Sequence, residues 1–203
     1  NTDNMTISGE TIDYGPCAFL EHYDPAAVFS SIDRHGRYAF GRQPGIAQWN
    51  LARLASALLP LIDADADRAT ERATAAVQGF APRFEAHWRR VLHTKLGCVG
   101  TDAELHALAD EYLALLQAHR VDFTLAFRGL ADAALGNDAP LTALFGDAAG
   151  ALAPWLQRWH RRCAAEPASP ADRATALRRT NPIHIPRHHL VEAALSAAEE
   201  HND

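Results

Sequence analysis

Residues 1–16 read NTDNMTISGETIDYGP and carry most of the chemistry that the sequence displays. An Asp-Asn pair, Asp3-Asn4, is followed nine residues after the Asn by Asp13-Tyr14-Gly15. Kinase-type sites use the same groups: an Asp beside the attacking hydroxyl, an Asn on a metal ion and a second Asp on Mg²⁺. Mg²⁺ prefers oxygen ligands, and Gly15 permits the sharp turn that lets Asp13 point into a cleft. The stretch therefore predicts a metal-assisted phosphoryl-transfer site.

The same stretch resembles the signature of the selenoprotein O (SelO) family of pseudokinase-fold protein adenylyltransferases. The usual run of that family is close to NTDNMSISGETIDYGPCAF, and this chain reads NTDNMTISGETIDYGPCAF through Phe19. Similar blocks recur along nearly the whole chain, with a looser middle. They are Phe29–Asp33, Gly36–Tyr38, Gln48–Ala55, Asn181-Pro182, and Ile185–Arg187 before His189.

The resemblance implies a kinase-like fold that binds ATP in a reversed pose and transfers AMP to Ser, Thr or Tyr hydroxyls of proteins. It implies that Asp3 is the proton acceptor. It also implies that Asn4 and Asp13 are ligands of Mg²⁺, or of Mn²⁺ in its place, and that Asp13 lies against the phosphates of ATP. The expected partners are ATP and protein substrates with hydroxyl side chains.

Two alternatives to adenylyl transfer stay open. The first is a catalytically silent pseudokinase scaffold that binds a partner protein; the intact set of Asp3, Asn4 and Asp13 favours an enzyme instead. The second is ordinary γ-phosphoryl transfer. The adjacent Asp-Asn pair and the ten-residue step from Asp3 to Asp13 depart from the layout of protein kinases, so this alternative ranks lower.

Nucleotide-binding elements outside the motif are sparse in this sequence. Lys95 is the single lysine, and no glycine-rich phosphate-binding run is present. We therefore expect residues 1–203 to be the C-terminal part of one kinase-like catalytic domain, without its N-terminal lobe and C-terminal tail. We expect little transferase activity from these residues alone. Lys95, at the end of a helical stretch, is expected to be a solvated surface residue.

The expected fold class is mainly α, the C-terminal helical lobe of a kinase-like fold with a small β-hairpin that carries the metal motif. Residues 1–43 are expected to form that hairpin, through Thr6-Ile7 and Thr11-Ile12, and a loop placed like a kinase activation segment. Residues 44–203 are expected to form the helical lobe, because apolar residues recur there at three- and four-residue spacing. Proline, glycine and capping signals, including a Thr101-x-x-Glu104 capping box, place helices at about 44–61, 66–78, 82–96, 101–119, 122–136, 140–145, 148–164, 170–179 and 187–200.

Composition narrows the choice of partners and compartment. A net charge of −6 and a pI near 6.0 give no indication of nucleic acid or an anionic membrane as partner. No apolar run approaches the roughly 18 residues of a membrane span. The cysteines, Cys17, Cys98 and Cys163, lack metal-site spacing and indicate a reducing cytoplasm. The expected location is the cytoplasm of a bacterium. Cys17 is expected to be a small buried residue and not a redox group.

Four other patterns receive structural interpretations. Asp63, Asp65 and Asp67 copy the start of a calcium loop, but its Gly and Glu are missing, so a helix N-terminus is expected. The histidines near Glu192, which are His184, His188 and His189, are not expected to bind metal. Residues 48–50 are expected to contact the metal loop. Residues 181–187 are expected to form a loop and helix start that docks the last helix.

Overall fold

A computed structural model describes residues 2–10 and 18–201 of the chain. The chain is mainly helical, as predicted, and the residues described contain no strand, only an isolated antiparallel bridge between His22 and Asp122. Contacts divide the chain into two compact units, and the boundary falls within helix α3 (Phe80–Lys95). The first unit comprises residues up to Cys17 with Asp24–Trp88, and the second comprises Ala18–Tyr23 with Arg89–Asp203.

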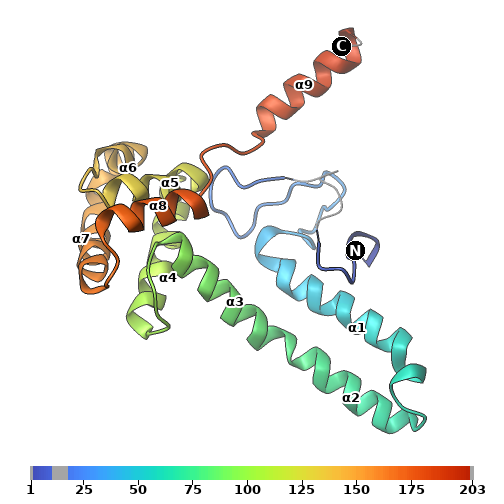
Figure 1. Ribbon diagram of the computed structural model, residues 1–203. Coiled ribbons are helices and arrows are strands. Elements are labelled where there is room, and N and C mark those ends of the chain that lie inside the picture. Colours follow the sequence, from blue (N-terminus) through green and yellow to red (C-terminus); the bar gives the residue numbers. More distant parts are fainter. Residues whose placement is uncertain (1, 11–17, 202–203) are drawn as a thin grey trace. The chain divides into compact units, whose positions relative to one another are not determined.

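The first unit is built on two helices, α1 (Gln43–Ile62) and α2 (Ala66–Gln78), which pack side by side (Figure 1). Asp65 begins α2, because its side chain accepts hydrogen bonds from the Asp67 and Arg68 amides at 2.9 and 3.2 Å. This cap satisfies two of the amides that have no partner in the first turn of a helix. The helix-terminus interpretation of the acidic run is therefore confirmed at Asp65.

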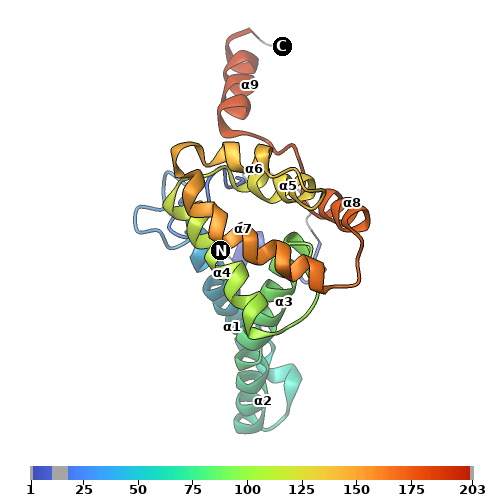
Figure 2. The ribbon, with the colours of Figure 1, turned by 90° about the vertical axis from the view of Figure 1, so that its left-hand side faces the viewer.

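The second unit is a bundle around α4 (Ala103–Ala118) and α7 (Ala149–Ala165), which pack against each other. In Figure 2, α7 crosses in front of α4. Three further helices complete the bundle, with α5 contacting both α6 and α8. They are α5 (Phe123–Ala133), α6 (Ala139–Leu144) and α8 (Pro170–Thr180), and the exposed α9 (His188–His201) follows them.

Large aromatic residues fill the core of this bundle and also satisfy its buried polar atoms. The rings of Tyr112 and Trp155 stack with centroids 4.1 Å apart. The Tyr112 hydroxyl donates to the Ala126 carbonyl at 2.8 Å, and the Trp155 indole donates to the Leu108 carbonyl at 2.8 Å. Because each buried polar group has a partner, these rings can be buried without the cost of an unpaired donor.

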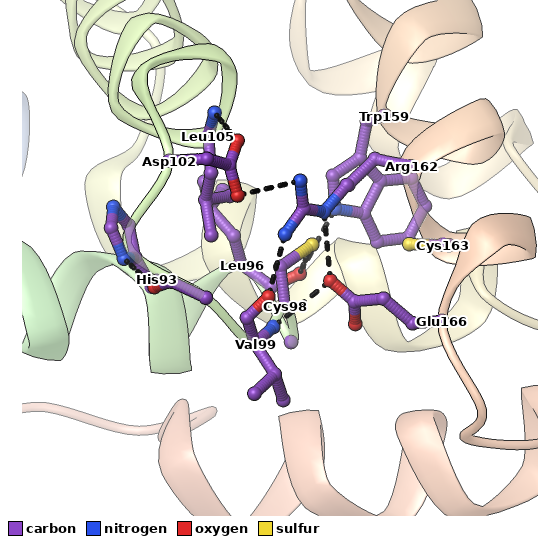
Figure 3. A network of polar contacts seen from close by, with 12 residues as sticks. His93, Leu96, Cys98, Val99, Asp102, Leu105, Trp159, Arg162, Cys163 and Glu166 are labelled. Carbon is purple, nitrogen blue, oxygen red and sulfur yellow. Dashed lines mark hydrogen bonds and ion pairs between the residues drawn. The ribbon is translucent and has the colours of Figure 1, made fainter.

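A polar network fixes the loop between α3 and α4 onto α7 (Figure 3). Arg162 donates to Glu166 at 2.9 Å and to the Val99 carbonyl at 2.6 Å, and it pairs with Asp102 at 2.9 Å. Glu166 in turn accepts from the Val99 amide at 3.0 Å. Arg162 of α7 therefore binds two groups of the loop, the Val99 carbonyl and the Asp102 carboxylate, as well as Glu166, which follows α7.

Most helix boundaries agree with the predicted ones to within a few residues, and the exceptions have local causes. Helix α3 begins at Phe80 and includes Pro82, which is tolerated in a first turn because its missing amide would have no partner there. Helix α5 ends at Ala133, short of the predicted 136, because Gly136 has a φ of 85°. None of the helices in the described parts of the chain is long and apolar enough to cross a membrane.

The predicted capping box at the start of α4 is wrong. Asp102, and not Thr101, is the N-cap, and its side chain accepts from the Leu105 amide at 3.0 Å. This bond, with the charge of Arg162, holds the pKa of Asp102 below its usual value. Asp is as good an N-cap as Thr or better, and here it also pairs with Arg162, so it takes the position.

Candidate active site

The first two groups of the motif lie together on one short turn. Asp3 and Asn4 belong to a 3₁₀ turn, Thr2–Asn4, and both side chains are exposed. Asp13 lies outside the described residues, so its convergence with Asp3 and Asn4 remains a prediction. Within the described ranges, no group of three or more His, Cys, Asp or Glu side chains is arranged to hold a metal ion.

The residues after Asn4 form a turn, and residues 2–10 contain no strand. Within this turn the hydroxyls of Thr6 and Ser8 lie 3.0 Å apart, and the Glu10 amide donates to the Ser8 hydroxyl at 3.4 Å. The second predicted strand, Thr11-Ile12, lies outside the described residues. The observed turn includes Ile7, a residue of the first expected strand, so the hairpin is unconfirmed.

Helix α1 contacts the motif through Asn50, as predicted for residues 48–50. The side-chain amide of Asn50 donates to the sulfur of Met5 at 3.5 Å, and Asn50 is only 8% exposed. Two residues earlier, the Gln48 side chain donates to the Val77 carbonyl of α2 at 3.2 Å. The motif is therefore attached to a helix that is itself attached to α2.

Asp33 organises the loop that precedes α1. Its two carboxylate oxygens accept from the amides of Arg37 and Tyr38 at 2.8 and 2.7 Å. These backbone hydrogen bonds, the one from Tyr38 foremost, lower the pKa of Asp33. At the other end of the loop, Gly41 approaches Pro25 so closely that a Cβ there would lie 3.0 Å from the Pro25 carbonyl oxygen. The loop is thus held at two places, by the hydrogen bonds of Asp33 and by the close contact of Gly41 with Pro25.

An open cavity of about 930 Å³ lies in this loop region of the first unit. Its wall is mostly apolar in area, and it also carries charged side chains, the arginines Arg34, Arg37 and Arg42 and the carboxylate of Asp33. Arginine guanidinium groups can pair with anionic groups such as phosphates or carboxylates. The guanidinium of Arg37 contacts an aromatic ring, with its Cζ 5.0 Å from the centre of the Trp49 ring. Asp3 and Asn4 are not among the lining residues.

The expectation that Lys95 is solvated is wrong. Its Nζ donates to Asn181 Oδ1 at 2.9 Å and lies 4.6 Å from the centre of the Phe127 ring. Burial lowers the pKa of Lys95 to about 8. Asn181 is fully buried, and its amide nitrogen donates to the carbonyls of Lys95 and Phe127 at 2.9 and 3.2 Å. The Asn181-Pro182 block therefore joins the end of α3 to α5, which no local sequence signal revealed.

Other charged groups lie on the last two helices. On α9, His188 and Glu192 are exposed. On α8, Arg178 pairs with Asp132 at 2.7 Å. Asp3 and Asn4 carry exposed oxygen atoms of the kind that Mg²⁺ prefers as ligands.

Comparison with known proteins matches all 203 residues of the chain, 1–203, to the family model "Protein adenylyltransferase SelO". The chain is 51% identical over 206 residues to a protein nucleotidyltransferase YdiU of Rhizobium leguminosarum bv. trifolii, covering 100% of this chain and 41% of the relative. It is 53% identical over 204 residues to the protein of the same name from Chromobacterium violaceum, covering 100% of this chain and 42% of the relative. For the Cereibacter sphaeroides protein of that name the identity is 52% over 198 residues, with 98% and 40% covered. The chain thus spans about two fifths of the length of these curated relatives, and it belongs to the SelO family of protein adenylyltransferases.

Proposed function

We propose that this chain supplies the metal-binding motif and the helical lobe of a protein adenylyltransferase with a kinase-like fold. The observation that carries the proposal is the intact set of Asp3, Asn4 and Asp13 in a chain that matches the SelO family along its whole length. The structure supports it, because Asp3 and Asn4 lie side by side on an exposed turn and the next residue, Met5, contacts Asn50 of α1. The domain division into residues 1–43 and 44–203 is part of the same proposal.

In the proposed reaction a Ser, Thr or Tyr hydroxyl of a protein attacks the α-phosphorus of ATP. A bond forms between that oxygen and the phosphorus, the bond from phosphorus to the bridging oxygen breaks, and pyrophosphate leaves. Asp3 accepts the hydroxyl proton, because a carboxylate on an exposed turn can reach an incoming substrate. Most of the catalysis is then positioning and charge neutralisation.

The donor set of the motif fits Mg²⁺. Asn4 offers an amide oxygen and Asp13 a carboxylate, and Mg²⁺ is bound in proteins by one or two such oxygens together with nucleotide phosphates. Bound Mg²⁺ would neutralise charge on the phosphates of ATP. Asn4 and Asp13 hold the ion in this proposal, and Asp13 also lies against the nucleotide.

The test uses the full-length protein with Asp3→Ala and Asp13→Ala variants. Loss of the proton acceptor should lower AMP transfer at least about 100-fold while ATP binding persists, because general-base catalysis contributes factors of that size. Loss of Asp13 should weaken Mg²⁺-dependent ATP binding as well as transfer. Asp147→Asn, at an exposed aspartate of the second unit, is the matched control and should change neither. Undiminished transfer by either alanine variant refutes the assignment of that residue.

A further inference from the structure

The segment that contains the loop before α1 carries positive charge in a chain that is negative overall. Residues 24–53 contain two aspartates and four arginines, whereas the whole chain has a net charge of −6. The arginines are Arg34, Arg37, Arg42 and Arg53. The first three line the open cavity of about 930 Å³, and every residue that lines this cavity belongs to the first unit. The cavity and its charges are therefore one local feature of that unit.

The carboxylate in the cavity wall is already occupied by the backbone. Asp33 accepts from the amides of Arg37 and Tyr38 through its two oxygens, at 2.8 and 2.7 Å. Among the residues that the structure describes, 2–10 and 18–201, no carboxylate forms an ion pair with any of the three arginines of the wall. Each guanidinium carries five N–H donors, so these side chains can bind an anion that enters the cavity.

The guanidinium of Arg37 is positioned by aromatic rings. Its Cζ lies 5.0 Å from the centre of the Trp49 ring and 5.7 Å from the centre of the Tyr38 ring. The Tyr38 carbonyl in turn accepts from the Gln43 side chain at 2.7 Å, which attaches this part of the loop to the start of α1. A guanidinium that contacts aromatic faces keeps its N–H edge for a carboxylate, and a donor that is held in place loses less conformational entropy when a ligand binds.

The apolar part of the wall favours a peptide over a free phosphate ion as the ligand. Ile32 is 88% exposed and Tyr38 is 37% exposed, and Ile46 of α1 also lines the cavity. A phosphate ion would leave these apolar groups in water and would fill only a small part of about 930 Å³. A peptide segment with both acidic and apolar side chains can pair with the arginines and cover the apolar groups at the same time.

We propose that this cavity binds an acidic peptide segment of a protein substrate. Arg34 and Arg37 pair with carboxylates of the segment, and Ile32 packs against one of its apolar side chains. The inference rests on the proposed function in one respect, which is that the segment belongs to the protein that receives AMP. The substrates are then proteins that carry acidic residues near the target hydroxyl.

Contacts within the first unit connect this cavity to the motif. Trp49, whose ring Arg37 contacts, is followed in α1 by Asn50. The Asn50 side chain donates to the sulfur of Met5, which is the residue after the Asp-Asn pair. Consecutive residues of one helix therefore contact the cavity wall and the motif, as expected if both serve the same substrate.

The experiment measures peptide binding to the full-length protein by fluorescence anisotropy, without any transfer reaction. The probe is a fluorescein-labelled peptide, Glu-Glu-Leu-Ser-Glu-Glu, and the comparison peptide has Gln in place of every Glu. The variants are Arg34→Gln, Arg37→Gln and Ile32→Ser. Arg68→Gln is the matched control, because Arg68 is an arginine of the same unit whose side chain is 70% exposed and does not line the cavity. Inorganic phosphate is added as a competitor.

The acidic peptide should bind wild-type protein about tenfold more tightly than the Gln peptide, because hydrogen bonds between charged groups are the stronger ones. Each arginine variant should bind the acidic peptide several-fold more weakly, Ile32→Ser should weaken the binding of both peptides, and the control should change neither. Equal binding of the two peptides, or undiminished binding by both arginine variants, overturns the inference. Displacement of the peptide by an equal concentration of inorganic phosphate also overturns it, because the cavity would then be a site for simple anions.

AMP transfer to the serine of the same peptide separates this inference from the proposed function. The KM for the acidic peptide should rise several-fold in Arg34→Gln, more than kcat changes, because the lost contact is one that binds substrate. A KM that does not rise in either arginine variant overturns the assignment of the cavity to the substrate. If wild-type protein transfers no AMP to any protein or peptide, the proposed function fails, and the anisotropy measurement still decides whether the cavity binds an acidic peptide.

Discussion

Lys95, the single lysine of the chain, should make the stability of the fold depend on pH in an unusual range. Burial lowers its pKa from 10.5 to about 8. The ammonium keeps favourable contacts, since it donates to Asn181 at 2.9 Å and lies 4.6 Å from the centre of the Phe127 ring. Replacing it by Met removes the titrating group but keeps an unbranched chain of similar length. The perturbation is therefore Lys95→Met, measured as a function of pH.

Between pH 8 and pH 10.5 the unfolded chain keeps the Lys95 proton and the folded chain has lost it. The unfolded state then binds more protons, so the free energy of unfolding rises with pH in this window. The lowering from 10.5 to about 8 is about 2.5 pKa units, which corresponds to a rise of at most about 3 kcal/mol. Below pH 8 both states are protonated, and the cost of burying the ammonium is fully present.

Denaturant unfolding at pH 7.5, 9 and 10 checks this prediction. Tyrosines and cysteines also titrate at high pH, but they are common to wild type and Lys95→Met, so the difference between the two isolates Lys95. A ¹³C-lysine label adds a direct readout, because the 203-residue chain gives one lysine side-chain signal. That signal should titrate near pH 8. A midpoint near 10.5, together with parallel pH profiles for the two proteins, would refute the burial argument.

Two further predictions concern the loop between α3 and α4. Gly97→Ala should lower the free energy of unfolding by at least about 2 kcal/mol, because Gly97 has a φ of 68° and a Cβ there would lie 2.8 Å from the Leu177 side chain. Gly146 also has a positive φ, but a Cβ there would meet open space, so Gly146→Ala should cost less. Denaturant unfolding of both variants measures the difference. Cys163 should be alkylated well before Cys98. Cys98 is only 5% exposed, and the hydrogen bond between the two thiols raises the pKa of Cys98 and lowers the pKa of Cys163. Peptide mass mapping that found Cys98 modified first would contradict this prediction.

Sequence patterns located the helices because the signals that end helices are local. Pro44 acts through its own backbone in the first turn of α1, and Asp65 acts through a side chain that caps amides in the first turn of α2. The structure places both where the pattern predicts. Thr101 and Asp102 show the limit of this reasoning. Both residue types cap helices, and the choice depended on Arg162, which lies sixty residues further along the chain.

The environment of Lys95 could not be predicted from local sequence, because its partner Asn181 is 86 residues away. A lysine at a helix end is usually solvated, and only the packing of α3 against the Asn181 loop reverses that default. The same holds for Arg187 and Asp122, which are far apart in sequence and 2.7 Å apart in the structure. For the candidate site, Asp3 and Asn4 are placed together as expected from their adjacency, and the convergence of Asp13 remains a prediction.

The central claim is adenylyl transfer, and the most direct test follows the two ends of the ATP triphosphate separately. Full-length protein is incubated with Mg²⁺ and with ATP labelled either on the α-phosphate or on the γ-phosphate. Label from the α-phosphate should appear on protein and disappear in Asp3→Ala. Label on protein from the γ-phosphate alone would mean ordinary kinase chemistry, and bound nucleotide with neither label transferred would mean a scaffold; either result would contradict the account.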